Sequence, residues 1–306
     1  MHQSARIRSE PPAGELGEVH YADTPWIEIW PARRWNWLFL DLRELWSHRE
    51  LLYFLTWREI RIRYAQTILG AMWAVLQPLL NTLVFTIFFG QLAGIPSDGL
   101  PYPIWSYCGL LPWMYFAQSL HMSTNSLVAN QNLITKVYFP RILVPMSGVF
   151  VPLADMAFGL LLLLGMMVRY SIAPGRALIY APLFLLLALS LALAVGLWLS
   201  ALNALYRDVR HTLPFLVQFW MFVSPVVYPA SQVPLSKIVW GVELPLRGLY
   251  GLNPMVGVIE GFRWSVLGTG LGPSIALWTS VATTLLLLLG GSLYFHRTER
   301  TLADTI

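Results

Sequence analysis

Residues 178–202 read LIYAPLFLLLALSLALAVGLWLSAL, a run of apolar, aromatic and small side chains without one charged residue. A transmembrane helix needs about 20 consecutive, predominantly apolar residues. This run meets that requirement by itself, and we predict that it crosses a membrane. The class of the whole chain depends on how often such runs recur on either side of it.

The overall composition agrees with a membrane protein. Of the 306 residues, 56% are hydrophobic and 12% are charged, and the mean hydropathy is +0.57. A soluble domain carries roughly 25% charged residues. The composition therefore argues against a soluble fold, a disordered chain, collagen or a coiled coil. We expect an all-α polytopic membrane protein.

Six apolar runs are candidate transmembrane helices, and together they define a predicted transmembrane domain of residues 67–296 with a cytoplasmic tail of residues 297–306. The second and fifth runs contain more polar residues and prolines than the others. The six runs are residues 68–92, 104–126, 143–168, 178–202, 211–228 and 274–295.

The distribution of Lys and Arg predicts the orientation in the membrane. With the N-terminus inside and six spans, 15 of the 20 Lys and Arg residues lie in cytoplasmic segments and five lie outside. Cytoplasmic loops carry the excess of Lys and Arg in membrane proteins. We therefore place both termini in the cytoplasm. The net charge of +4 reflects these loops, and we expect no nucleic-acid partner.

The N-terminal fifth of the chain is polar. We predict a flexible tail at residues 1–34 and an amphipathic helical region at residues 35–66, in which Ser47–Glu50 forms a capping box and a second helix ends near Tyr64. Aromatic and basic residues on such a helix are typical of one that lies in the membrane interface; a soluble helix packed on a partner is the alternative. No secretory signal pattern is visible, so we expect the first apolar span to direct insertion.

A long outer segment at residues 229–272 contains two apolar runs, Trp240–Leu252 and Met255–Leu267, each too short to span a membrane. Backbone can turn back at membrane depth only where protein or water satisfies its polar groups. We predict re-entrant or interfacial helices that gate or cap the outer face. An ordinary periplasmic loop is the alternative.

Several kinds of chemistry have no support in the sequence. The only lysines, Lys136 and Lys237, lie outside any phosphate-binding loop, so ATP hydrolysis would need a separate subunit. The six histidines never show metal-ligand spacing, and the single cysteine, Cys108, excludes an intrachain disulfide. Asp155 is the only acidic residue well inside a strong span, without an evident basic partner, which is poor support for ion-coupled transport. A hydrogen bond between helices, or exposure to a polar cavity, would explain this Asp structurally.

Two groups of residues are candidates for function. The loop at residues 130–141 combines apolar side chains with two cations, which is typical of a short helix that docks in a groove of a cytoplasmic partner, or of a solvated loop. Aromatic side chains can stack on sugar rings and would suit a glycan channel, although each ring can also be explained by core packing. The channel candidates are Trp73, Tyr115, Phe116, Phe215, Phe219 and Phe222.

Four stretches, in this order, resemble the membrane subunit of ABC-2 type polysaccharide exporters, the Wzm-like permeases of O-antigen and related cell-surface glycans. The resemblance covers about residues 30–300, with Glu59 standing where an Asp is expected. The first stretch is RELLYFLTWRE (49–59) with RYAQTILGAMWAVLQP (63–78), and the second is NLITKVYFPR (132–141). The third is LNALYRDVR (202–210) with PF (214–215) and SPVVY (224–228), and the fourth is LNPM (252–255) with IEGFRW (259–264).

The resemblance implies a homodimer bound to two copies of a P-loop ATPase subunit, which holds the ATP and Mg, so that no cofactor belongs to this chain. The substrate would be a polyprenyl-pyrophosphate-linked glycan that crosses the bacterial cytoplasmic membrane. The coupling helix would comprise Leu133, Ile134, Lys136, Tyr138, Phe139 and Arg141. The outer gate would comprise Asn253, Pro254, Glu260, Arg263 and Trp264. We expect the pyrophosphate to meet Arg58, Arg61 or Arg63 through charge-assisted bonds.

Three other functions remain open at this stage. A membrane enzyme acting on polyprenyl-linked sugars would need acidic or basic groups in an outer loop, and the first outer loop offers only Asp98. A secondary transporter would be expected to show inverted repeats, which are not visible. An ABC-2 exporter of another lipid or drug is the third. The sequence does not distinguish O-antigen from capsule, teichoic-type or other wall polymers.

Overall fold

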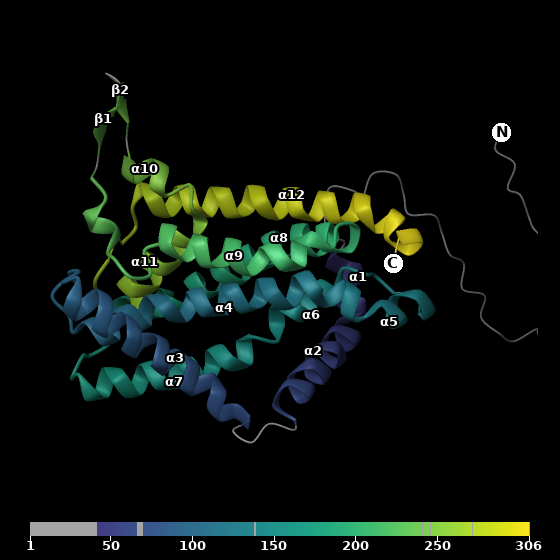
Figure 1. The fold of residues 1–306 in the computed structure, drawn as a ribbon, viewed down its shortest axis with the longest axis horizontal. Coiled ribbons are helices and arrows are strands. Elements are labelled where there is room, and N and C mark those ends of the chain that lie inside the picture. The colour runs from purple at the N-terminus through teal and green to yellow at the C-terminus, as the bar shows by residue number, and fades with distance from the viewer. Residues whose placement is uncertain are drawn as a thin grey trace, which may run out of the picture. The chain divides into compact units, whose positions relative to one another are not determined.

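The computed structural model describes residues 42–65, 70–137, 139–234, 236–239, 242–244, 246–270 and 272–305. Helices dominate these residues, and the long ones run roughly side by side (Figure 1). The predicted tail at residues 1–34 lies outside the described residues, as do the residues up to 41.

Two helices, α1 (Leu42–Ser47) and α2 (Arg49–Tyr64), occupy the described part of the N-terminal region. The predicted end of the second helix at Tyr64 is confirmed. The predicted capping box is wrong, because the N-cap is His48 and no side chain caps α2. Ser47 still belongs to α1, whereas an N-cap residue has a non-helical backbone. Its hydroxyl instead lies 3.0 Å from His48 Nδ1.

Four helical segments in the described part of the chain are long and apolar enough to cross a membrane. They match the first, third, fourth and sixth predicted runs, which confirms those four by length and composition. The segments are Trp73–Leu92, Leu143–Arg169, Ala177–Leu205 and Ile275–Glu299.

Two of these segments are irregular. The first consists of a 3-10 turn, η3 (Gly70–Met72), then α3 (Trp73–Phe85) and a π-helical extension, η4 (Thr86–Leu92). The third predicted run divides into α6 (Leu143–Phe150) and α7 (Leu153–Arg169). The break falls at Pro152, because proline lacks the N–H that would continue the helical hydrogen bonds.

The other two segments are regular. A 3-10 turn, η5 (Arg176–Tyr180), leads into α8 (Ala181–Leu205). The last helix, α12 (Ile275–Thr305), has 31 residues. At 1.5 Å per residue it is about 46 Å long, which exceeds the roughly 30 Å hydrocarbon core of a bilayer. Part of α12 must therefore project beyond the membrane.

The second predicted run forms α4 (Tyr102–Ala129), of which 19 of the 28 residues are buried. Around it pack α3, α6, α7, α8, α9 and α11. Protein neighbours accept hydrogen bonds from its buried tyrosines: the Tyr115 hydroxyl donates to the Val149 carbonyl at 3.2 Å, and the Tyr107 hydroxyl donates to the Gly159 carbonyl at 2.8 Å. This central position explains why α4 is less apolar than the four segments above.

The fifth predicted run forms α9 (Asp208–Val223), which has 16 residues. Its length of about 24 Å is short of the roughly 30 Å hydrocarbon core. The count of six transmembrane helices therefore stays a prediction, with four spans confirmed by length and composition.

The outer segment differs from the prediction in its first half. It contains a turn, η6 (Ala230–Gln232), a hairpin of β1 (Lys237–Val239) and β2 (Val242–Leu244), and a short helix, α10 (Leu246–Tyr250). The prediction of one helix over Trp240–Leu252 is wrong, because Val242–Leu244 pair as a strand with Lys237–Val239; Trp240 itself lies outside the described residues. The second half is confirmed as a helix, α11 (Pro254–Leu267), with 13 of its 14 residues buried.

Apolar packing forms two separate clusters. The larger one surrounds α4, α8 and α11. The smaller one joins α2 to α4, α6, α8 and α12 and to the short helix α5 (Gln131–Lys136). We name it the cytoplasmic cluster after the side of the membrane on which the sequence predicts it. Its buried members are Leu55, Leu127, Ile134, Phe139, Leu143, Val144, Leu197, Ala201 and Phe295.

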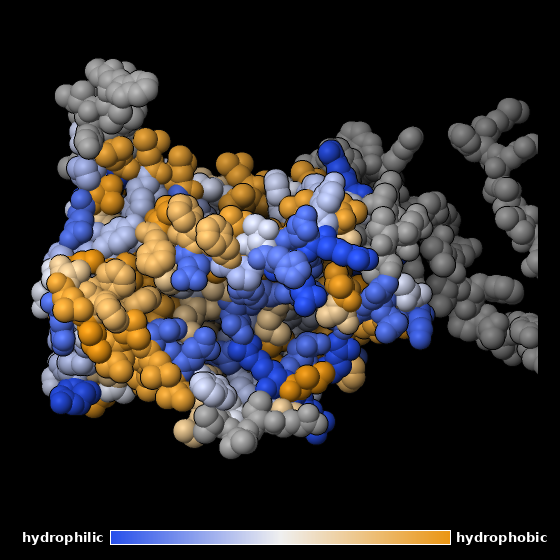
Figure 2. Space-filling view, viewed as in Figure 1, coloured by the Kyte–Doolittle hydropathy of each residue, from blue (hydrophilic) through white to orange (hydrophobic). Residues whose placement is uncertain are grey.

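The surface of the described residues carries many large apolar side chains. In the space-filling view, apolar patches cover much of the helical body, and polar side chains gather toward the end that carries α5 (Figure 2). Contiguous exposed apolar surface marks a lipid or subunit contact. The apolar side chains exposed on α3 and its extension are Trp73, Leu79, Leu80, Leu83, Val84, Ile87, Phe88 and Leu92.

Candidate functional site

The predicted coupling segment contains α5, with Asn130 as its N-cap residue. Ile134 and Phe139 are buried in the cytoplasmic cluster, and Leu133 packs against it. These side chains face the protein's own core, whereas Lys136 is exposed. Another predicted member, Tyr138, lies outside the described residues. A partner would therefore meet the polar face of α5, and the apolar side chains hold the helix in place.

Polar contacts hold this segment at both ends. At its start, Arg58 of α2 donates to the Asn130 side-chain oxygen and also pairs with Glu59 at 2.7 Å. At its end, the Arg141 backbone N–H donates to a Glu299 carboxylate oxygen at 3.1 Å, and Arg141 Nη1 donates to the Glu299 carbonyl at 2.6 Å. The segment is thus fixed between α2 and the projecting end of α12.

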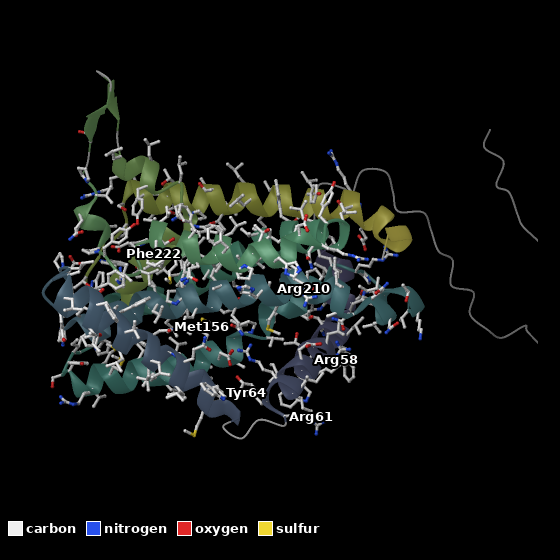
Figure 3. The ribbon with its side chains drawn as sticks, in the orientation of Figure 1. Arg58, Arg61, Tyr64, Met156, Arg210 and Phe222 are labelled. Carbon is white, nitrogen blue, oxygen red and sulfur yellow. The ribbon has the colours of Figure 1, made fainter. Side chains whose placement is uncertain are left out.

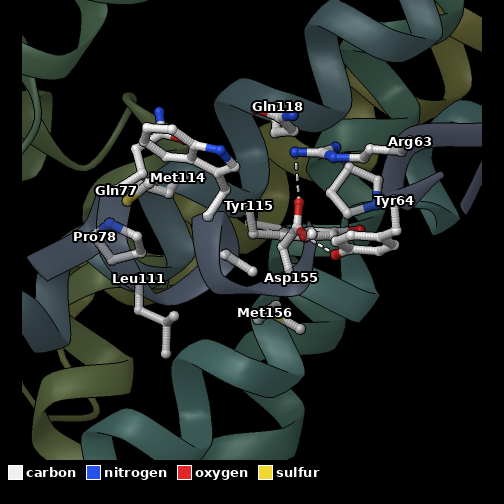
Figure 4. Close-up of a pocket in the computed structure, with 14 residues that line it drawn as sticks. Arg63, Tyr64, Gln77, Pro78, Leu111, Met114, Tyr115, Gln118, Asp155 and Met156 are labelled. Atoms are coloured by element: carbon white, nitrogen blue, oxygen red, sulfur yellow. Dashed lines mark hydrogen bonds and ion pairs between the residues drawn. The ribbon is translucent and has the colours of Figure 1, made fainter. Parts of the chain in front are cut away.

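A cavity of about 220 Å³ lies between the end of α2 and helices α3, α4 and α7 (Figure 4). We name it the polar pocket. It brings together one predicted pyrophosphate ligand and two predicted glycan-channel residues, which the sequence analysis treated separately. Its lining residues are Arg63, Tyr64, Gly70, Trp73, Ala74, Gln77, Pro78, Leu111, Met114, Tyr115, Gln118, Pro152, Asp155 and Met156.

A network centred on Asp155 holds the charged groups of the polar pocket. Arg63 Nη2 pairs with Asp155 Oδ2 at 2.7 Å, and the Tyr64 hydroxyl donates to Asp155 Oδ1. Burial and the hydrogen bond to Asp155 raise the pKa of the Tyr64 hydroxyl, so it stays protonated and keeps donating. With its carboxamide oxygen turned toward Arg63, Gln118 accepts from Nη1 at 2.7 Å. Asp155 therefore has the basic partner that the sequence did not reveal.

The three predicted pyrophosphate ligands differ in their surroundings, and Figure 3 labels two of them, Arg58 and Arg61. Arg63 is ion-paired with Asp155, and Arg58 contacts Glu59 and Asn130. Arg61 is exposed and forms no ion pair within the described part of the chain. Of the three, Arg61 is the cation that remains available to an external anion.

The predicted channel aromatics fall into three places. Trp73 and Tyr115 line the polar pocket. Phe116 is fully buried and packs edge-on against Trp220, with ring centroids 5.1 Å apart, so it lines no surface of the described chain. Phe215, Phe219 and Phe222 lie on one exposed face of α9, spaced four and three residues apart. Residues at this spacing are neighbours on a helix surface.

The predicted outer-gate residues form two contact sets around α11, the first partly buried and the second fully buried. Asn253 caps the helix, accepts from the Met255 N–H at 3.2 Å and from the Trp220 indole at 2.9 Å, and donates to Ser224 Oγ at 3.0 Å. Pro254 is buried at the first turn, and Trp264 stacks on Tyr180 with centroids 5.8 Å apart. These contacts tie the end of α9 to the start of α11.

Arg263 forms the second set. Its guanidinium donates to the carbonyls of Pro225 at 2.6 Å, Val226 at 2.7 Å and Trp105 at 3.3 Å, and pairs with Glu260 at 3.0 Å. It also lies 3.7 Å from the centre of the Trp105 ring and has no exposed surface. This arginine therefore joins α4, α11 and the turn after α9.

Among the described residues, no group of three or more His, Cys, Asp or Glu side chains could hold a metal ion.

A comparison with protein-family models identifies the class of transporter. Residues 50–267 match the model described as ABC-2 type transporter. The chain belongs to the ABC-2 type transporter family. The match spans the helices from α2 to α11 and therefore includes α5, the polar pocket and the Arg263 contacts.

Three known proteins resemble the chain over most of its length. The O-antigen export system permease protein RfbA of Myxococcus xanthus is 30% identical over 267 residues, which is 87% of this chain and 98% of that protein. A Klebsiella pneumoniae protein of the same name is 24% identical over 70% of this chain and 79% of its own length. The polysialic acid transport protein KpsM of Escherichia coli is 25% identical over 81% of this chain and 93% of its own length.

Proposed function

We propose that this chain is the membrane subunit of an exporter that moves a polyprenyl-pyrophosphate-linked polysaccharide across the bacterial cytoplasmic membrane. The observation that carries the proposal is the 30% identity to an O-antigen export permease over 98% of that protein. The three relatives above are named for O-antigen export or for polysialic acid transport. In this proposal the chain has no catalytic site, and separate P-loop subunits bind ATP and Mg and hydrolyse the ATP.

The polar face of α5 is the proposed contact with the ATPase subunits. The cytoplasmic cluster and the contacts of Arg58 and Arg141 fix α5 to α2 and α12. A force applied at α5 would therefore reach α2 and α12 together. We assign Lys136 and Tyr138 to the contact itself, whereas Arg141 acts through Glu299 to position the helix.

The exposed aromatic face of α9 is the proposed wall of the glycan path. Phe215, Phe219 and Phe222 present three rings on one face, with 74%, 62% and 47% of their surface exposed. In a homodimer, two such faces would enclose a channel in which the rings stack on sugars with little specificity. Phe116 is left out of this assignment because it is buried.

The pyrophosphate is proposed to meet Arg61. This side chain is exposed on α2, which carries the exposed aromatic residues Tyr53, Phe54 and Trp57. Exposed aromatic and basic side chains on one helix suit a position in the headgroup region of the membrane. A lipid-linked anion would lie at this depth while its apolar tail stays in the bilayer.

The outer segment at residues 229–272 is proposed to gate the exit. The Asn253 and Arg263 contacts make α11 a fixed part of the bundle, so the movable elements in this proposal are the hairpin and α10. The excess of Lys and Arg in the predicted cytoplasmic segments supports an orientation with both termini inside.

Deletion of the chain in its native host tests the function. The expected result is loss of the surface polysaccharide and accumulation of polyprenyl-linked polymer that is accessible only after the inner membrane is opened. Complementation with the wild-type chain should restore both. Unchanged surface polysaccharide in the deletion strain would contradict the proposal. Accumulation of a sugar-free lipid or a drug would favour an ABC-2 exporter of another substrate.

A further inference from the structure

The polar pocket has hydrogen-bonding groups of both kinds but little net charge. The positive charge of Arg63 is offset by Asp155 at 2.7 Å, and the other polar lining groups, such as Gln77 and Gln118, are neutral. Binding of a phosphate relies on cationic groups that can turn to it. A cation already paired with a carboxylate suits a neutral, polyhydroxylated ligand better, because hydroxyl groups both donate and accept.

The pocket also offers apolar surfaces beside these polar groups. Trp73 is half-exposed, and Pro78, Leu111 and Met156 line the wall. The volume of about 220 Å³ is below the roughly 300–1,000 Å³ of sites for drug-sized ligands. A pyranose ring has an apolar C–H face and a polar rim, so one ring of this kind matches both the size and the lining.

We infer that the polar pocket binds a single neutral sugar ring of the lipid-linked glycan, a site that rests on the export function proposed above. The Asp155 carboxylate can accept about four hydrogen bonds. Arg63 and Tyr64 each use one of these positions. The others accept from sugar hydroxyls. With its oxygen on Arg63, the Gln118 amide has N–H groups to donate, and the Trp73 indole covers the C–H face of the ring.

The position of Arg61 agrees with this assignment. Arg61 precedes Tyr64 by three residues on α2, and side chains at that spacing have Cβ atoms about 5–6 Å apart. A free cation therefore lies one helical turn from the pocket wall. A sugar in the pocket would place the pyrophosphate to which it is linked close to Arg61.

Saturation-transfer NMR on the full chain in nanodiscs tests the site, with no sugar-based detergent present. The probes are neutral hexoses and N-acetylhexosamines, each with and without inorganic pyrophosphate. We expect saturation transfer from the wild-type protein to at least one of these sugars. Added pyrophosphate should not change the strength of that transfer. Trp73→Ala should weaken binding about fivefold, as expected for loss of one stacking contact. Gln77→Leu, which leaves the ion pair intact, should also weaken binding.

Trp278→Ala is the matched control, because Trp278 is 68% exposed on α12 and lies outside the pocket. Transfer should be the same in this variant as in the wild type. The inference is overturned if no sugar receives saturation, if Trp73→Ala and Trp278→Ala bind equally well, or if pyrophosphate displaces the sugar. These results are independent of the deletion experiment: a chain that exports glycan but binds no ring in the pocket disproves only the site.

Discussion

Replacement of Arg263 by Met should destabilise the chain by about 4 kcal/mol or more. The guanidinium has no exposed surface and donates to the carbonyls of Pro225, Val226 and Trp105 and to Glu260. Removal of one member of a buried ion pair costs about 3–5 kcal/mol, and each buried carbonyl that loses its donor adds about 1–3 kcal/mol. Met keeps much of the side-chain volume, so the loss of unfolding free energy comes mainly from the polar contacts.

Changes at Glu260 separate these contributions. Glu260→Gln keeps an oxygen that can accept from Arg263 but leaves the buried guanidinium without its counter-charge, so a loss of about 3–5 kcal/mol is expected. This loss stays smaller than that of Arg263→Met, because the three carbonyls keep their donors. The double variant Glu260→Met/Arg263→Met removes both charges but leaves the three carbonyls without Arg263. Those carbonyls are three of the four acceptors of Arg263. The double variant should therefore regain less than half of the unfolding free energy that Arg263→Met loses.

Thermal unfolding of the purified chain, followed by size-exclusion chromatography, measures these effects. One kcal/mol corresponds to about 2 °C for a chain of this size, so Arg263→Met should lower Tm by about 8 °C or more. Arg169→Met is the control, since Arg169 is exposed at the end of α7. A Tm for Arg263→Met within about 2 °C of the control, or a larger loss for Glu260→Gln than for Arg263→Met, would refute the reasoning.

Three further predictions concern other parts of the chain. Arg141→Ala and Glu299→Ala should each uncouple ATP hydrolysis from glycan export in the assembled transporter, because each removes one of the two hydrogen bonds that hold the end of the α5 segment; equal loss of hydrolysis and export would contradict this. Gly148→Ala should lower Tm, because the new Cβ would lie 2.7 Å from the Ser123 backbone nitrogen. Gly165→Ala is the control: its Cβ would have nothing within 4 Å, so Tm should stay unchanged or rise. A lower Tm for Gly165→Ala than for Gly148→Ala would contradict the packing. Phe219→Glu should lower glycan export in the native host, because a charged side chain replaces an exposed ring that is proposed to stack on sugars; unchanged export at a normal protein level would exclude the α9 face as the wall of the glycan path.

The transmembrane architecture was largely predictable, because a helix that crosses the lipid needs about 20 predominantly apolar residues and such runs are visible in the sequence. Four runs were confirmed by length and composition. The second run was weak for a physical reason: α4 is surrounded by protein, so Ser, Thr and Pro are tolerated where lipid would exclude them. Helix α11 was also predictable, since an apolar run too short to span can still be buried. The hairpin was missed because an apolar run alone does not distinguish strand from helix.

The polar contacts of the candidate site were not predictable in the same way. Arg63 and Asp155 belong to different helices, and no local pattern links them. The same holds for Arg141 and Glu299, which are 158 residues apart. Sequence patterns identified the arginines of α2 as a group, and only the structure separates the paired Arg58 and Arg63 from the exposed Arg61.

The most direct test of the central claim is site-specific crosslinking of α5 to a partner in the native host. Because Cys108 is buried, Thr135→Cys supplies one accessible thiol on the exposed face of α5, and Ala173→Cys supplies a matched thiol on the predicted outer side. The account predicts that Thr135→Cys crosslinks to a P-loop ATPase in stoichiometric amount and that Ala173→Cys does not. If neither position captures an ATPase, and the chain purifies alone in mild detergent, the transporter account is contradicted.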